Sequence, residues 1–401
     1  MWDLALRLVL ALWHVVGLLL VLVLLIEFGT DGLRRAIIWL RHRRPTRPDR
    51  AARSDAYAGA DWATPYFDEF RTAVRLEWRP FVEWWQLPLR GNYLTIDERG
   101  LRSTPGEHDA GPDALRIFCF GGSTMMGMGA RDERTIPALL QHRLRQLGVT
   151  AAVTNMGQLG HNNMQETIAL QLLLKNGDRP DIAVFYDGIN EMVCAEQTGR
   201  PDGVIFDAPR RAEFNLLFAD RRRDLIAAAL ISAMPRTVRR LREITGLRLR
   251  GPIPTRLRDT DSLAGVDISA LARLVVEAYA ANLRVVRLLA DFYGFSPLFF
   301  WQPVITTKRI KSADELRWES DETGDVEKRR RLFAAIIEEY RRHPELAAAG
   351  DVVDLSALFD DRAEPVYIDF YHLSEEGNAA VAKAMLPAIT AACSERISGT
   401  A

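Results

Sequence analysis

A serine lies in a glycine-rich turn directly after an apolar run of the sequence. Leu115–Phe120 has the composition of a buried strand, and Gly121-Gly122-Ser123-Thr124 follows it, with a helix expected shortly afterwards. A serine at a strand-to-helix turn can present its hydroxyl as a nucleophile while its backbone N–H faces a developing oxyanion. By itself, this tetrapeptide is more typical of an ordinary turn in which the serine caps a helix.

An acid and a histidine stand three residues apart further along the chain. Asp369 and His372 follow a predicted strand at Asp351–Leu355 and precede a predicted helix at Asn378–Ala392. Within one turn of chain, a carboxylate can hold the tautomer of an imidazole whose other nitrogen faces a serine. The alternative is a helix capped by Ser374 beside an incidental histidine.

Two further turns could donate hydrogen bonds to an oxyanion. One runs from Asn155 to Asn162 after a predicted strand at Val149–Asn155, and the other from Tyr186 to Glu191 after a strand at Ile182–Tyr186. Both contain glycine and an amide side chain, and backbone N–H groups and asparagine side chains are the donors that acyl transfer requires. Each turn alone has a common loop composition.

Strand and helix patterns alternate from Leu115 onward. The expected strands cover residues 115–120, 149–155, 182–186, 297–301 and 351–355, and the clearest helices cover residues 136–147, 164–174 and 378–392. This order predicts an α/β fold: a three-layer, doubly wound parallel sheet with helices on both faces. Functional groups of such a sheet collect at the carboxyl ends of the strands, where all four turns lie. A helical insertion is expected at about residues 197–283, because arginines outnumber acids fourteen to seven between Arg200 and Asp259.

Taken together and in this order, the four turns resemble the blocks of the SGNH hydrolase superfamily, also called GDSL-like esterases. The matching segments are Phe120–Thr124, Asn155–Gly160, Gly188–Asn190 and Asp369–His372, and the resemblance covers about Leu115 to Ala392 without the insertion. It implies the flavodoxin-like SGNH fold. The usual Gly-Asp-Ser is Gly-Gly-Ser in this chain, and the usual Gly-x-Asn-Asp ends in a glutamate, but neither departure removes a catalytic group.

The resemblance implies a catalytic triad of Ser123 as nucleophile, His372 as general base and Asp369 as the residue that orients it. The oxyanion hole would consist of the backbone N–H groups of Ser123 and Gly160 and the side chain of Asn190. Further residues expected to line the pocket are Gly122, His161 and Glu191. The implied reaction is two-step acyl transfer from an acyl or acetyl ester of a lipid or a glycan to water. Two alternatives stay open: an O-acyltransferase that uses the same triad on envelope glycans, and a non-enzymatic anchored binding module.

The composition of the chain gives no indication of a cofactor. Its 401 residues carry a formal net charge of -1, which offers no global case for nucleic-acid binding. The three cysteines have no metal-type spacing and allow one disulfide at most. His-Glu-x-x-His, Gly-x-Gly-x-x-Gly and Gly-Lys-Ser/Thr patterns are absent from the sequence, so neither a metal nor a nucleotide is predicted.

The first residues of the chain are strongly apolar. Leu8–Ile26 contains no charged residue and, with Leu4 extending it, is long enough as a helix to span roughly 30 Å of hydrocarbon. We therefore expect a single-pass membrane protein with an anchor at residues 1–28 and a basic juxtamembrane linker at residues 29–60. An aromatic-rich extension at residues 61–114, expected to pack onto the main domain, and a hydrolase domain at residues 115–396 complete this division.

The charges beside the apolar stretch and the family resemblance predict opposite orientations. Eight arginines between Arg34 and Arg53 favour a cytoplasmic domain by the positive-inside rule. Anchored hydrolases of the resembling type commonly act on envelope or extracellular esters. We expect the catalytic domain on the extracytoplasmic side.

Overall fold

The computed structural model describes residues 2–24, 49–107, 111, 113–207, 210, 211, 214, 237, 263, 265–320 and 326–399. The chain divides into two compact units, one of Met1–Arg47 with Phe206–Asp259 and one of Pro48–Ile205 with Thr260–Ala401. In the first unit, helix α1 covers Trp2–Leu24. Residues 25–28 of the predicted anchor, residues 29–48 of the predicted basic linker and most of the Arg-rich insertion lie outside the described residues.

The transmembrane anchor expected at Leu4–Ile26 is not supported. Among the described residues, no helix is both long enough and apolar enough to cross a membrane.

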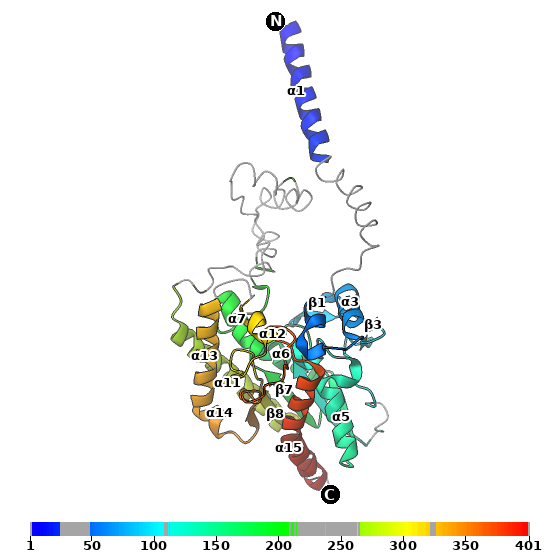
Figure 1. Ribbon diagram of the computed structural model, residues 1–401, viewed down its shortest axis with the longest axis vertical. Coiled ribbons are helices and arrows are strands. Elements are labelled where there is room, and N and C mark those ends of the chain that lie inside the picture. Colours follow the sequence, from blue (N-terminus) through cyan, green and yellow to red (C-terminus); the bar gives the residue numbers. More distant parts are fainter. Residues whose placement is uncertain are drawn as a thin grey trace. The chain divides into compact units, whose positions relative to one another are not determined.

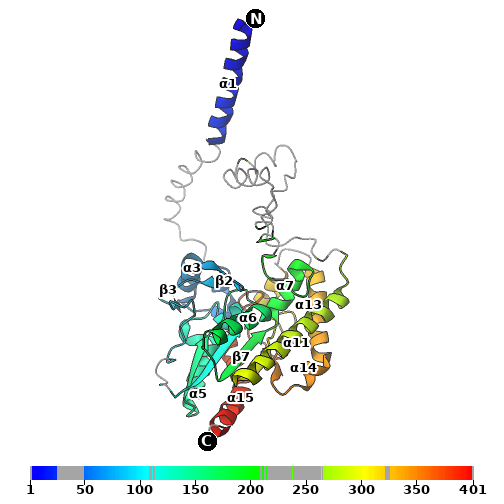
Figure 2. The same cartoon turned by 180° about the vertical axis from the view of Figure 1, so that it is seen from behind.

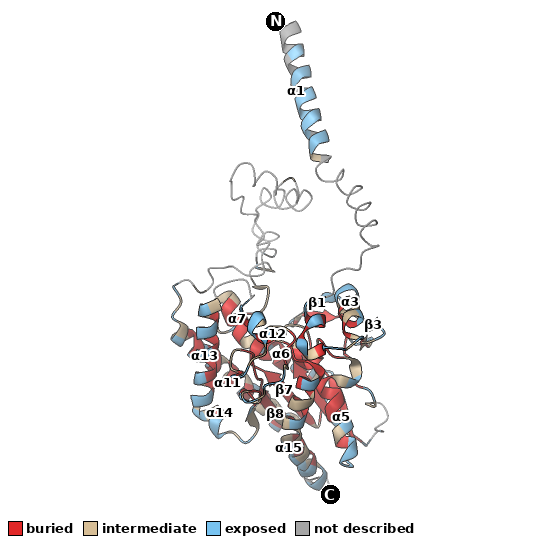
Figure 3. Ribbon diagram, in the orientation of Figure 1, coloured by how far each residue is buried: buried red, intermediate tan, exposed pale blue. Residues whose placement is uncertain are grey.

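The second unit is built on five parallel strands. Their order across the sheet is β6 (Ala151–Asn155), β5 (Leu115–Gly121), β7 (Ile182–Asp187), β8 (Ser296–Trp301) and β9 (Val352–Asp354). The three central strands are apolar runs that are mostly buried, as strands covered on both faces must be; Figure 3 shows this buried centre. In chain order the arrangement is 2-1-3-4-5, the flavodoxin-like order, so the predicted doubly wound sheet is present.

Helices cover both faces of the sheet. In Figure 1, α5 (Ile136–Gln146) and α15 (Glu375–Gly399) pack against each other on the near face. In Figure 2, α6 (Asn163–Lys175) and α11 (Ile268–Tyr293) lie on the opposite face, where α11 also contacts α7 (Ile189–Thr198) and α13 (Val326–Arg342). The remaining helices of this unit's sheet domain are short: α4 (Ser123–Met126), the 3-10 turn η5 (Asp132–Arg134), α12 (Ala313–Ser320) and α14 (Pro344–Ala348).

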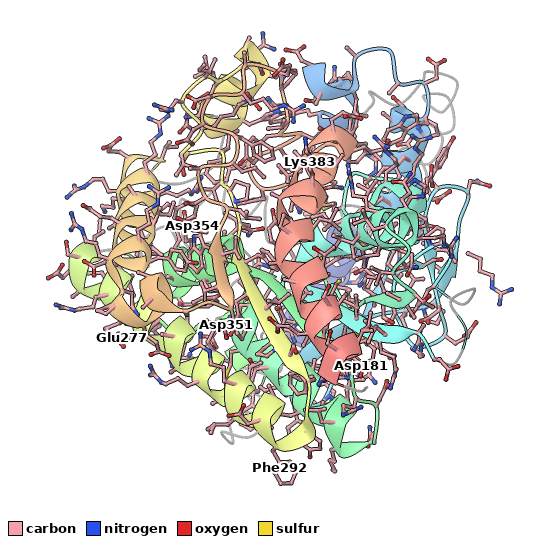
Figure 4. The ribbon with its side chains drawn as sticks, turned by 90° about the horizontal axis from the view of Figure 1, so that it is seen from below. Asp181, Glu277, Phe292, Asp351, Asp354 and Lys383 are labelled. Carbon is pink, nitrogen blue, oxygen red and sulfur yellow. The ribbon has the colours of Figure 1, made fainter. Side chains whose placement is uncertain are left out.

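Helix α15 runs from the carboxyl edge of the sheet to its amino edge. Figure 4, seen from below, shows Asp181 beside the end of this helix, and Arg396 Nε donates to the Asp181 carbonyl at 3.1 Å. The loops that could form a site therefore gather at the edge opposite the one seen in Figure 4.

The helical insertion is shorter than the sequence predicted. Helix α11 begins at Ile268, well before residue 283, where the insertion was expected to end, and belongs to the sheet domain. Asp267 caps its first turn, and apolar residues at helical spacing are buried, among them Leu271, Val275 and Leu283. The high charge of the neighbouring segment obscured this amphipathic pattern.

The extension before the sheet domain is a compact layer of short elements. It comprises two 3-10 turns, η2 (Ala51–Arg53) and η3 (Asp55–Tyr57), helix α3 (Ala63–Ala73), and two antiparallel pairs, β1 (Leu76–Arg79) with β2 (Glu83–Gln86) and β3 (Leu89–Arg90) with β4 (Thr95–Ile96). Most of its aromatic side chains are packed inward as predicted, whereas Trp78 and Phe81 are 69% and 75% exposed. Residues 51–57, which the sequence analysis assigned to the linker, also pack into this layer.

Candidate active site

Ser123 is the first residue of α4, at the carboxyl end of β5. The strand ends at Gly121, and Gly122 follows in an extended conformation directly before Ser123, so the serine stands at a sharp strand-to-helix turn. Its side chain is partly exposed, while its neighbour Thr124 is buried and donates to Gln302 Oε1 at 2.9 Å. The turn therefore places one hydroxyl, that of Ser123, at the open edge of the sheet.

The sequence-predicted acid, base and nucleophile are brought together in one chain of hydrogen bonds. His372 Nε2 lies 2.7 Å from Ser123 Oγ, and His372 Nδ1 lies 2.7 Å from Asp369 Oδ2. Since an ionised carboxylate can only accept, Nδ1 carries the proton and Nε2 accepts from the serine hydroxyl. This is the tautomer that a general base toward Ser123 requires.

Asp369 is held as a carboxylate by its surroundings. Burial raises its pKa, but the electrostatic interaction with His372 and hydrogen bonds from His372 and from two backbone N–H groups outweigh burial, and the pKa is lowered. The two N–H groups belong to Tyr371 and His372, and both donate to Asp369 Oδ1 at 2.7 Å. One carboxylate oxygen thus fixes the turn, and the other orients the imidazole.

The segment that carries Asp369 and His372 is a closed turn. Ile368 N donates to the His372 carbonyl at 3.0 Å, and Ser374 N donates to the Val366 carbonyl at 2.7 Å. Glu315 closes the turn from outside, because its Oε1 accepts from the backbone N–H of Val366 at 3.0 Å. Lys308 in turn pairs with Glu315 at 2.6 Å, and both side chains are fully buried.

The sequence analysis missed Lys308 and Glu315. Besides their bonds to each other and to Ser312, they bind backbone groups about fifty residues further on, and nothing in the local sequence pattern marks either residue. Only the fold brings the two segments together.

Asn190 lies beside the turn that carries Ser123. Gly122 has no side chain, and the space where its Cβ would stand is occupied by Asn190 Nδ2, which donates to the His161 carbonyl. Among the described residues, the backbone N–H groups of Ser123 and Gly160 have no hydrogen-bond partner. Two open N–H groups and a side-chain amide are the donor set expected of an oxyanion hole.

His161 does not line the pocket as predicted. Its ring is 1% exposed, packs edge-on against Trp84 and Trp85, and bonds through Nε2 to the Trp84 carbonyl at 3.0 Å. Burial lowers its pKa to about 4, so the ring is neutral and donates this bond. The sequence could not reveal this role, since both ring partners come from the extension.

Glu191, which the sequence predicted to line the pocket, binds backbone groups of the framework. Its carboxylate accepts from Gly188 N and Asn163 N, each at 2.7 Å, and so joins the turn before Asn190 to the start of α6. Behind it lie the buried carboxyl groups of Glu166 and Asp187, whose pKa values burial raises well above the ordinary value. The charge of Asp187 further raises the pKa of Glu166, and the charge of Glu191 further raises that of Asp187. This cluster is a buried support for the Asn190 turn.

The comparisons with known proteins give structural matches only. No protein-family model and no curated protein matches the chain. Among solved structures, it is similar to a carbohydrate acetylesterase family member from Sinorhizobium meliloti, with 17% identity over 70% of this chain and 99% of that one and a TM-score of 0.34. It is also similar to the acetyl xylan esterase AlAXEase (15% identity, 69% and 100% coverage, TM-score 0.33).

A third similar structure is a member of the lipolytic protein G-D-S-L family from Veillonella parvula (12% identity, 69% and 99% coverage, TM-score 0.34). These three are described as esterases or as a lipolytic protein. The function proposed next rests on the residues of this chain.

Proposed function

We propose that this chain is a serine hydrolase of the SGNH type that cleaves carboxylic ester bonds. The observation that carries the proposal is the hydrogen-bond chain from Ser123 Oγ through both nitrogens of His372 to Asp369, with 2.7 Å at each link. A binding protein has no need of this alignment at an open sheet edge.

The reaction follows from these contacts in two steps. His372 Nε2 takes the hydroxyl proton as Ser123 Oγ attacks the ester carbonyl, and the oxyanion that forms is met by the N–H groups of Ser123 and Gly160 and the amide of Asn190. Collapse of this intermediate breaks the ester C–O bond, and His372 returns the proton to the leaving alcohol. Water then repeats the sequence on the acyl-serine, which releases a carboxylic acid and restores the hydroxyl of Ser123.

The proposal is tested by labelling the full chain with a fluorophosphonate probe and by measuring hydrolysis of p-nitrophenyl acetate. We expect Ser123 to be labelled, and we expect Ser123→Ala to lose both labelling and hydrolysis while keeping the thermal unfolding transition of the parent. A folded Ser123→Ala variant that retains the parent rate would refute the assignment.

The substrate and the compartment are proposals that rest on the sequence alone. We propose that the substrate is an acyl or acetyl ester of a lipid or an envelope glycan and that the catalytic domain lies outside the cytoplasm. Alkaline phosphatase fused after Ala401 should be active, and an inactive phosphatase beside an active cytoplasmic reporter at the same position would refute this location. Product analysis with and without a glycan acceptor separates hydrolysis from acyl transfer to a sugar hydroxyl.

A further inference from the structure

The loop that follows the nucleophile helix is held by two tyrosines of the extension. In this loop, Met126–Ala130, the backbone N–H of Gly129 donates to Tyr66 Oη at 2.9 Å, and the Gly129 carbonyl accepts from Tyr57 Oη at 2.5 Å. Tyr57 belongs to η3 and Tyr66 to α3, and both side chains are buried. Both polar groups of one buried backbone residue are thus satisfied by side chains far away in the sequence.

A third side chain of the extension, that of Arg102, binds the same loop. Arg102 is 1% exposed, and its guanidinium donates to the carbonyls of Gly127 at 2.8 Å and Ala130 at 2.6 Å and to Asp132 Oδ1 at 3.0 Å. Because this buried guanidinium donates a hydrogen bond to each of these acceptors, it fixes the path of the chain that follows Ser123.

The same loop packs directly against the segment that carries Asp369 and His372. Gly129 has φ +96°, and a Cβ built on it would lie 2.2 Å from Ile368 Cδ1, so the bare backbone packs against the residue before Asp369. On the other side, Arg131 donates to both carboxylate oxygens of Glu375, at 2.9 and 2.8 Å. The loop and the residue after it therefore contact the chain on both sides of the Asp369–His372 turn, at Ile368 and at Glu375.

Apolar contacts also connect the extension with the chain on both sides of the candidate triad. One buried cluster combines Tyr57 and Tyr66 of the extension with Met126, three residues after the nucleophile, and Ile368, one residue before the acid. Trp62 of the extension covers the guanidinium of Arg131 at 4.6 Å. The extension thus contacts both the segment that carries Ser123 and the segment that carries Asp369 and His372.

We propose that Tyr57 and Tyr66 are positioning residues, which hold the Met126–Ala130 loop against Ile368 and thereby set Ser123 at hydrogen-bond distance from His372. The inference rests on the proposed function, since it assigns these hydroxyl groups a part in the alignment of that triad. Displacement of a reacting group by about 1 Å can lower a rate by about 100-fold, so small shifts of this loop matter.

The test compares Tyr57→Phe, Tyr66→Phe and the double variant with Tyr93→Phe in the full chain. Each change removes one hydroxyl and keeps the ring. Tyr93 lies in the same layer, with its ring 6.5 Å from that of Tyr66, and its hydroxyl has no hydrogen bond among the described residues. The measurements are kcat and KM for p-nitrophenyl acetate, the rate of fluorophosphonate labelling of Ser123, and the thermal unfolding transition.

We expect the double variant to lose about 10- to 100-fold in kcat and in labelling rate, with KM within about threefold of the parent. Tyr93→Phe should match the parent in every measurement. All rates are taken per folded molecule at a temperature well below the transition, so a purely stabilising role of the tyrosines leaves them unchanged. An unchanged kcat per folded molecule in the double variant overturns the proposal.

The single variants keep the proposal testable if the double variant does not fold. In that case, parent values of kcat and labelling rate in both folded single variants overturn it. The proposed function fails by a different result, namely activity in folded Ser123→Ala. The two ideas can therefore be rejected separately.

Discussion

Replacement of Gly122 by alanine tests the oxyanion hole without changing any group proposed to react. A Cβ atom at this position would lie 1.9 Å from Asn190 Nδ2 and 3.1 Å from the His161 carbonyl oxygen. The first atom is the end of a side chain that can rotate away, and the second needs to yield by only a few tenths of an ångström. The backbone at Gly122, with φ -78°, accepts alanine, so the variant should fold and lose only the placement of Asn190.

The size of the effect follows from what Asn190 is proposed to do. Loss of one oxyanion donor lowers kcat by about 10²–10³, or about 2.7–4 kcal/mol of transition-state stabilisation. We expect Gly122→Ala to approach this loss with little change in KM, because the interaction forms in the transition state. The free energy of unfolding should change by about 1 kcal/mol or less, since a flexible side chain can relieve the clash.

The assay is hydrolysis of p-nitrophenyl acetate by Gly122→Ala, Asn190→Ala and the double variant, together with thermal unfolding. The double variant should be no slower than Asn190→Ala, because both changes remove the same donor. Gly350→Ala is the matched control, since a Cβ atom there meets nothing within 4 Å. A folded Gly122→Ala variant with kcat within about threefold of the parent refutes the reasoning, as does a double variant whose loss is the product of the two single losses.

Three further predictions concern charged and titratable groups. Because the pKa of Asp369 is lowered, the stability that its carboxylate contributes is present above about pH 4 and is lost as the pH falls through its folded pKa. Asp369→Asn should therefore weaken the fall in thermal stability at acid pH, and it should lower kcat by about 10⁴-fold. The pKa of buried His161 is lowered to about 4, so the unfolded chain binds more protons between about pH 4 and 6.5 and stability should fall by up to about 3 kcal/mol as the pH drops through this window. A folded His161→Gln variant that shows the same fall would contradict this. Lys308→Met leaves Glu315 buried without its cation and should cost about 3–5 kcal/mol in denaturant unfolding, while exposed Lys383→Met should cost almost nothing; equal effects would contradict the buried pair.

The catalytic edge of the fold could be predicted because parallel topology is highly constrained. Ser123, Gly160 and Asn190 each follow a buried apolar run, and strands that alternate with helices must run parallel with their carboxyl ends together. The alternation of strands and helices was therefore enough to bring these residues to one edge. The flavodoxin-like order of strands came from the family resemblance alone.

The supporting contacts could not be predicted, for an equally physical reason. His161 and Glu191 stand beside predicted site residues in the sequence, yet both side chains are used within the framework. Whether a side chain at a strand end faces substrate or packing depends on what covers it, and Trp84 covers His161 from a segment 77 residues away. The start of α11 was missed because an amphipathic helix beside a highly charged segment has no clear boundary in the sequence.

Three of the four segments that would carry the reaction are held by an acidic or basic side chain that binds backbone groups. Arg102 holds the loop after Ser123 by its carbonyls, Glu315 holds the turn before Asp369 by its N–H groups, and Glu191 holds the turn before Asn190 in the same way. Buried polar contacts of this kind are costly to break and leave little freedom to the backbone they bind. All three are outside the residues that would react, and only Glu191 lies next to one. The residues that would react can thus be recognised from four short segments, whereas the distances between them depend on side chains that those segments do not contain.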